Sequence, residues 1–214
     1  MVMRSEIRRD LTRSAQALAD VVWPQISQPW FGGGEVVPVE TATDVKIAKA
    51  LDVFAGIDLW LLRKDGITPI ASRVQFPDGR SYNTFTIRSW RKSGNDVELQ
   101  RRLRALKEVQ RGYLFPHVTI QAYVDNNSNR LIAAACVLTK DLFEHVDEYD
   151  DVTNRDGQSG FKVAGWSLLE QLGANIRVHW PDPKRDSRQL DLGMENTSAL
   201  KRPDPPVPYM PPPE

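Results

Sequence analysis

The 214-residue chain is poor in the residue types and sequence features that would by themselves indicate its class of protein. It contains one cysteine and three histidines, and 28 Lys and Arg residues balance 28 Asp and Glu residues. A single cysteine excludes an internal disulfide and a cysteine-rich metal site. His117, His145 and His179 lie far apart without a ligand-like spacing, so zinc sites and histidine-based triads have little support. The balanced charge gives no argument for a nucleic-acid, membrane or acidic partner.

Long hydrophobic runs are also missing. No apolar stretch approaches the ~20 residues needed to cross a bilayer, and the basic, amphipathic N-terminus lacks the apolar segment of a secretory signal. We therefore expect a soluble cytoplasmic protein with no membrane partner. The one cysteine, Cys136, lies in the apolar run Leu131 to Leu138. This predicts a buried structural thiol rather than a nucleophile.

The residues that are present suffice for one domain with an appendage. The chain is 41% hydrophobic, enough to bury one ordinary core. We expect a single α/β domain over residues 1–180 and a polar, proline-rich tail over residues 181–214. Seven prolines between Pro203 and Pro213 favour an extended tail without a core of its own. The tail is suited to docking a protein partner through Tyr209 and its neighbouring prolines.

The predicted elements are those of a central mixed sheet flanked by helices. Apolar positions at helical spacing over Ser5 to Val22 predict a helix that ends at Pro24, followed by a loop up to Pro38. The triplet Gly32 to Gly34 in this loop lacks the Gly-Lys-Ser/Thr of a phosphate loop. The later predictions are helices over about residues 43–55, 97–109 and 166–172, strands at 56–62, 70–76, 82–88, 117–124, 131–138, 161–164 and 176–180, and an acidic surface segment at 141–156.

The predicted hairpin of residues 56–76 carries polar groups where apolar ones are expected. Asp58 opens its first strand, and Arg73 and Gln75 lie midway along the second. Because side chains alternate across a strand, Arg73 and Gln75 point to the same face. An aspartate in an apolar strand is costly to bury unless it is paired, hydrogen-bonded or bound to a cation. Asp58 is therefore either a cap at the exposed end of the strand or a ligand.

At this hairpin the order of elements resembles the PD-(D/E)XK nuclease superfamily, the restriction-endonuclease-like fold, over roughly residues 40–140. In that family an aspartate and the acid of an E-x-K triplet hold Mg²⁺, while the lysine positions or activates the attacking water. The resemblance implies a Mg²⁺ cofactor, with Asp58 as the family aspartate and metal ligand. It implies that Arg73 and Gln75 stand at the catalytic positions of the triplet acid and lysine. The resemblance offers three candidates for the family's helix acid: Glu40, Asp44 and Asp52.

The altered triplet leaves three alternatives for this site. Asp58 and Arg73 cannot together form a two-carboxylate metal site, because the arginine adds positive charge beside the aspartate. Either catalysis uses an acid that has migrated from another position, or the site has become a pocket in which Arg73 contacts phosphate. The third alternative is structural, an ion pair between Asp58 and Arg73 within the sheet.

Positive charge gathers in the segment of residues 88–111. This segment holds eight Lys or Arg residues against three Asp or Glu residues, a local net charge of plus five. Several of these basic residues recur along one side of the predicted helix. Such a stripe suits contacts with a nucleic-acid backbone, and the nearby Trp90 and Tyr113 suit stacking on bases. A solvated face balanced by the acidic segment is the alternative. The candidate nucleic-acid-binding residues are Arg88, Arg91, Lys92, Arg101, Arg104, Lys107 and Arg111.

Two functions of different classes follow from these observations. One is a divergent Mg²⁺-dependent DNA or RNA nuclease. The other is a catalytically inactive subunit of nuclease fold that serves as a nucleic-acid-binding or protein-interaction module. Arg73 and Gln75 favour the second function, whereas Asp58 and the order of elements favour the first.

Overall fold

The computed structural model describes residues 13–39, 55–94, 97–108 and 112–182. Its contacts divide the chain into the units Met1–Asp182 and Pro183–Glu214. The second unit, which makes up all but the first two residues of the predicted tail, lies outside the described residues. So do all but the last residue of the helix predicted over residues 43–55, and one candidate of the basic segment, Arg111. None of the helices in the described ranges is long and apolar enough to cross a membrane.

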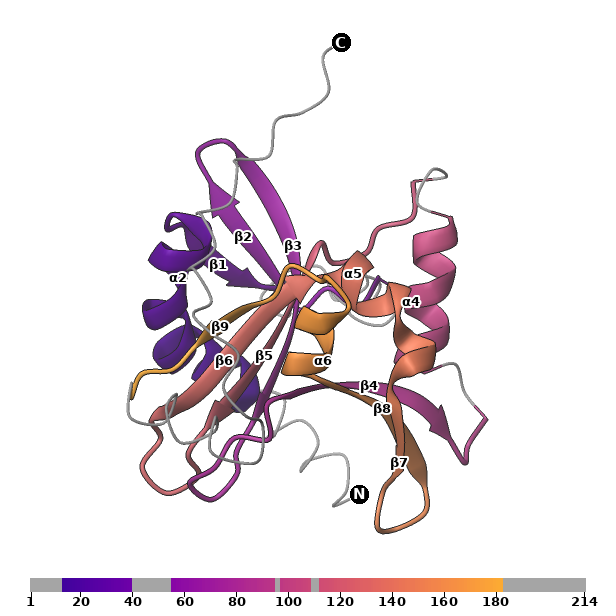
Figure 1. Cartoon of the computed structure of the whole chain (residues 1–214). Coiled ribbons are helices and arrows are strands. Elements are labelled where there is room, and N and C mark those ends of the chain that lie inside the picture. Colours follow the sequence, from indigo (N-terminus) through magenta and orange to yellow (C-terminus); the bar gives the residue numbers. More distant parts are fainter. Residues whose placement is uncertain (1–12, 40–54, 95–96, 109–111, 183–214) are drawn as a thin grey trace, which may run out of the picture. The chain divides into compact units, whose positions relative to one another are not determined.

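The first unit has an α/β architecture with two sheets (Figure 1). The main sheet is mixed, because β3 and β5 pair in parallel and its other neighbouring strands pair antiparallel. Its strands, in spatial order, are β1 (Glu35–Pro38), β2 (Leu59–Arg63), β3 (Gly66–Gln75), β5 (Val118–Val124), β6 (Leu131–Leu138) and β9 (Arg177–His179). The second sheet is antiparallel and holds β4 (Thr84–Arg91), β8 (Ser159–Gly165) and β7 (Asp150–Thr153) in that order.

The predicted hairpin is confirmed, and so are most later elements. Strands β2 and β3 pair with Leu59 opposite Ile70 and Arg63 opposite Gly66. The prediction of one sheet was incomplete, because the strand predicted at residues 82–88 is β4 and pairs with β8 rather than with β3. The helices of this part of the chain are α4 (Glu98–Lys107), α5 (Thr139–Glu144), η5 (Val146–Glu148) and α6 (Trp166–Gln171).

The predicted end of the first helix at Pro24 is wrong. The π-helical turn η1 (Leu18–Val22) continues directly into α2 (Trp23–Phe31). Pro24 is the second residue of α2 and directly follows the π-helical turn, where the regular i→i−4 hydrogen-bond ladder that a proline breaks is already interrupted. The helix ends at Gly32, whose φ of 70° is left-handed. The predicted loop therefore shrinks to a few residues before β1.

Two apolar clusters cover the two faces of the main sheet. One contains η1, α2 and residues of β2, β3 and β5, such as Ile70 and Ile120. The other contains residues of β4, β6, α5 and α6, such as Phe85 and Leu169. Cys136 is buried in the first cluster, as predicted, and burial raises the pKa of its thiol to about 12. Figure 1 shows η1 and α2 beside one side of the main sheet, with α4 and the second sheet beside the other.

Candidate functional site

A cleft of about 940 Å³ lies between the main sheet, the second sheet and α4. Strands β3 and β5 contribute residues from the main sheet, and β4, β7 and β8 contribute residues from the second. Five of the charged residues are arginines and two are carboxylates, so the lining is positive overall. They are Arg73, Arg88, Arg91, Arg101, Arg102, Asp58 and Glu98.

Strand alternation explains the polar floor of this cleft. Asp58 precedes β2, and in the antiparallel register it lies on the same face as Arg73 and Gln75. On the parallel neighbour β5, Gln121 is the partner of Arg73, and Thr119 is the partner of Ala71. The hairpin residues singled out from the sequence thus share one surface with polar residues of β5. Sequence analysis missed Thr119 and Gln121, although both interrupt the apolar pattern of their strand.

Asp58 caps the backbone of the neighbouring strand. Its Oδ2 accepts a hydrogen bond of 2.6 Å from the backbone N–H of Ser72. Its own backbone N–H donates to the carbonyl of Ile70, and its carbonyl accepts from the N–H of Val39. Asp58 therefore makes the contacts of a cap, which was one of the two predicted alternatives for this residue. The side chain is half-buried and also lines the cleft.

Arg73 reaches from the main sheet to the second sheet and to α4. Its Nη1 donates to the carbonyl and the hydroxyl of Thr86, at 2.6 and 2.7 Å. Its Nη2 pairs with Oε2 of Glu98 at 2.9 Å. Glu98, rather than Asp58, is therefore the carboxylate that pairs with Arg73. The two side chains keep 32% and 24% exposure, so solvent and ligands reach the pair.

Glu98 is a site residue that sequence analysis treated only as a charge. Its Oε2 also accepts from the backbone N–H of Arg88, at 3.3 Å. Glu98 is the first residue of α4, a position where the helix dipole favours an acid. The position of Glu98 at a helix start can be recognised in the sequence. Its partner Arg73, however, lies 25 residues away in the chain, and no local pattern indicates that contact.

Arg102 is a buried cation at the base of the cleft, only 6% exposed. Its guanidinium donates to the carbonyls of Ala55 and Gly56. Burial lowers the pKa of Arg102, and the nearby Glu98 and Asp58 counteract this. A Cβ at Gly56 would lie 2.6 Å from Nη2 of Arg102, so a larger residue there would displace the cation. Arg102 therefore fixes the chain just before Asp58.

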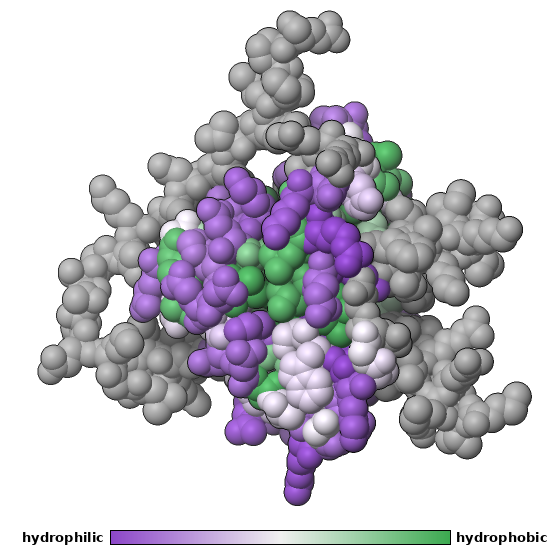
Figure 2. Space-filling model, turned by 90° about the vertical axis from the view of Figure 1, so that its right-hand side faces the viewer, coloured by the Kyte–Doolittle hydropathy of each residue, from purple (hydrophilic) through white to green (hydrophobic). Residues whose placement is uncertain are grey.

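The basic candidates divide into two groups. Arg88, Arg91 and Arg101 line the cleft together with Arg73. Lys92, Arg104 and Lys107 are exposed and do not line it, and Arg111 lies outside the described residues. Figure 2 views the side that carries α4, where hydrophilic residues surround a central hydrophobic area.

The described residues alone do not complete the Mg²⁺ site that the resemblance implies. Within those ranges no three His, Cys, Asp or Glu side chains are grouped so as to hold a metal ion. Arg73 already occupies Oε2 of Glu98, and a cation beside the carboxylate opposes the binding of a hard divalent ion. The helix acids that the resemblance offered, Glu40, Asp44 and Asp52, lie outside the described residues.

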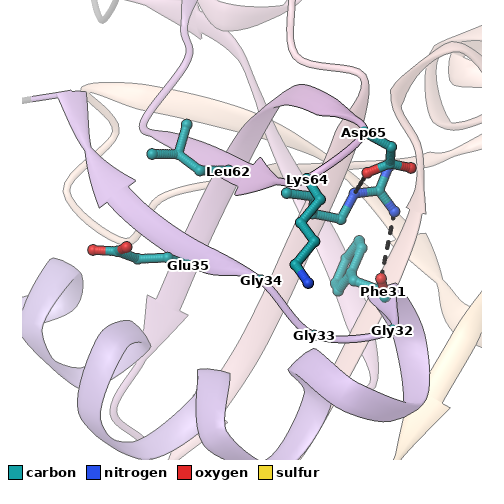
Figure 3. A pocket seen from close by; sticks show the side chains of 9 residues that line it. Phe31, Gly32, Gly33, Gly34, Glu35, Leu62, Lys64 and Asp65 are labelled. Atoms are coloured by element: carbon teal, nitrogen blue, oxygen red, sulfur yellow. Dashed lines mark hydrogen bonds and ion pairs between the residues drawn. The ribbon is translucent and has the colours of Figure 1, made fainter.

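A second pocket, of about 720 Å³, lies at the end of α2 (Figure 3). Gly32, Gly33 and Gly34 form one wall, and Lys64 and Asp65 belong to the β2–β3 turn. The Arg63 guanidinium in this pocket is held by Asp65 at 3.4 Å and by the Phe31 carbonyl at 3.4 Å. The C-terminal end of a helix carries partial negative charge and disfavours phosphate. The cleft is therefore the better candidate site.

Comparison of the chain with family models, with curated proteins and with solved structures gave no match.

Proposed function

We propose that the protein is a nucleic-acid-binding protein of nuclease-like fold and that its cleft holds the phosphate backbone of DNA or RNA. The observation that carries this proposal is the convergence on one cleft of four arginines that are at least partly exposed, Arg73 from β3, Arg88 and Arg91 from β4, and Arg101 from α4. Guanidinium groups match the geometry of phosphate oxygens and stay charged at every physiological pH. Phosphate contacts of this kind supply most of the affinity for a nucleic-acid backbone.

The Arg73–Glu98 pair supports a phosphate site rather than a purely structural pair. Glu98 presents one carboxylate oxygen to the guanidinium at 2.9 Å, as a phosphate oxygen would. Because both side chains are partly exposed, the pair contributes little stability. A phosphate that displaces Glu98 would gain the same charge-assisted contacts at small cost.

The decisive experiment compares two variants with equal loss of charge. One carries Arg88→Gln, Arg91→Gln and Arg101→Gln in the cleft; the control carries Lys64→Gln, Arg130→Gln and Lys140→Gln, at exposed positions that do not line the cleft. We expect the cleft variant to bind a single-stranded oligonucleotide at least about tenfold more weakly. Its log–log salt dependence should flatten by about 0.7 per lost phosphate contact. Equal behaviour of the two variants would remove the cleft from nucleic-acid binding.

A divergent nuclease is the second candidate, and the position of Glu98 favours it. The triplet acid of the family is missing at Arg73, but Glu98 brings a carboxylate to that arginine from α4. Glu98 is thus the described residue best placed to be a migrated acid. If so, the wild type should nick or degrade DNA or RNA with Mg²⁺ or Mn²⁺, and Asp58→Ala and Glu98→Gln should each abolish cleavage. A wild type that binds without cleaving under these conditions would leave binding as the function.

A further inference from the structure

Two hydrogen-bond donors are buried in the cleft without a partner among the described residues. They are Nε2 of Gln121, on β5, and Nε of Arg88, on β4. Gln121 is only 1% exposed, and its pairing with Arg73 sets it on the cleft face of the main sheet. An unsatisfied buried donor has lost its hydrogen bonds to water without replacement, which costs folding free energy. A bound acceptor atom would remove this cost at both positions.

The two donors differ in the acceptor that suits them. Nε of Arg88 belongs to a charged guanidinium, and it suits an anionic oxygen such as that of a phosphate. Nε2 of Gln121 is a neutral amide donor, and it suits a neutral acceptor such as a base carbonyl, a ring nitrogen or a sugar hydroxyl. A nucleotide unit carries both kinds of acceptor on one molecule.

We infer that the cleft takes single-stranded DNA or RNA, with one nucleotide unit seated so that Gln121 Nε2 donates to its base or sugar and an arginine holds its phosphate. This inference rests on the proposed function and names its substrate class. Base edges in a duplex are stacked and paired, so they reach a buried donor only after flipping. Unpaired bases can be splayed into a pocket directly.

The test uses fluorescence anisotropy with a mixed-sequence oligonucleotide, as single-stranded DNA, as single-stranded RNA and as a DNA duplex, at one salt concentration. We expect the wild type to bind at least one of the single strands about tenfold more tightly than the duplex. Gln121→Met keeps the length of the side chain without the donor and should lower single-strand affinity about tenfold. The control, Gln171→Met, alters an exposed glutamine at the end of α6 and should bind like the wild type.

The outcomes separate this inference from the proposed function. Equal affinity of the wild type for single strand and duplex overturns the inference, whatever the variants do. A folded Gln121→Met that binds single strands like the wild type overturns it too, while the cleft arginine variant still tests phosphate binding. If the wild type binds none of the three probes, the proposed function fails. If Gln121→Met does not fold, the NMR signal of the Gln121 side-chain amide in the wild type tests the inference instead. This signal should shift when a single strand is added and should not shift when the duplex is added.

Discussion

The two faces of the main sheet are built from the same strands and carry different kinds of side chain. On the face toward η1 and α2, β3 and β5 present apolar side chains, such as Ile70, Val74 and Ile120, to a closed cluster. On the face toward the cleft they present Arg73 and Gln121, together with other polar side chains. Adjacent residues of one strand thus belong to a core and to a candidate binding surface.

This contrast allows stability and the proposed binding to be tested separately. Because successive side chains point to opposite faces, a substitution at one position reaches one surface only. Residues of the apolar face should therefore control the free energy of unfolding, and residues of the cleft face should control affinity. Arg102 is an informative exception, because it lines the cleft and yet is buried like a core residue.

The largest effect is expected on the apolar face. Ile120 is fully buried, and Ile120→Ala should lower the free energy of unfolding by about 2–5 kcal/mol through lost transfer energy and a residual cavity. Urea titration followed by circular dichroism measures this. Ile67→Ala is the control, because Ile67 is 65% exposed at the start of β3, and it should change stability by less than about 0.5 kcal/mol. Similar losses in both variants would contradict the assignment of the faces.

Arg102 tests whether a cleft residue can act as a core residue. Arg102→Leu removes two charge-assisted hydrogen bonds and leaves the carbonyls of Ala55 and Gly56 without this donor. We expect a loss of about 1.5–3 kcal/mol in the free energy of unfolding. Arg104→Leu, on the exposed side of α4, should change it by less than about 0.5 kcal/mol. An unchanged Arg102→Leu would mean that the cation contributes no net stability.

Glu98 provides a test of the cleft face, where affinity and not stability should change. Glu98→Gln removes the carboxylate that pairs with Arg73, and single-strand affinity should rise about threefold because a competing anion is gone. Stability should change by at most about 1 kcal/mol, since the pair is partly exposed. Glu144→Gln makes the same charge change at an exposed position of α5 and should leave affinity unchanged. Weaker binding by Glu98→Gln would instead mean that Glu98 helps to hold the ligand.

Cys136 should have the smallest effect at neutral pH. Burial raises the pKa of its thiol from 9.0 to about 12, so the folded state keeps the proton longer than the unfolded state. Its ionisation should leave stability unchanged below about pH 9 and should lower it as the pH rises from 9 toward 12. The difference in unfolding free energy between wild type and Cys136→Ala should therefore be constant between pH 7 and 8 and should shift against the wild type by pH 10. Parallel pH profiles would contradict burial of the thiol.

Sequence reasoning succeeded where one local rule controlled the outcome. The hairpin, α4 and strands β5 and β6 follow from alternation, helical spacing and turn residues, and all of them are present. It failed at Pro24, because nothing in the sequence shows that a π-helical turn precedes this proline and that the helix continues past it. It also failed to separate β4 from the main sheet, since alternation does not say which strand is the neighbour.

The sequence by itself determined which side chains share a face. Asp58, Arg73 and Gln75 lie on one side because the period of a strand is fixed by backbone geometry. Only the tertiary structure decided their partners. Glu98 meets Arg73 because α4 packs beside β4, and Gln121 lies beside Arg73 because β5 pairs in parallel with β3. Such contacts depend on how distant elements pack and pair, and no local pattern in the chain records that.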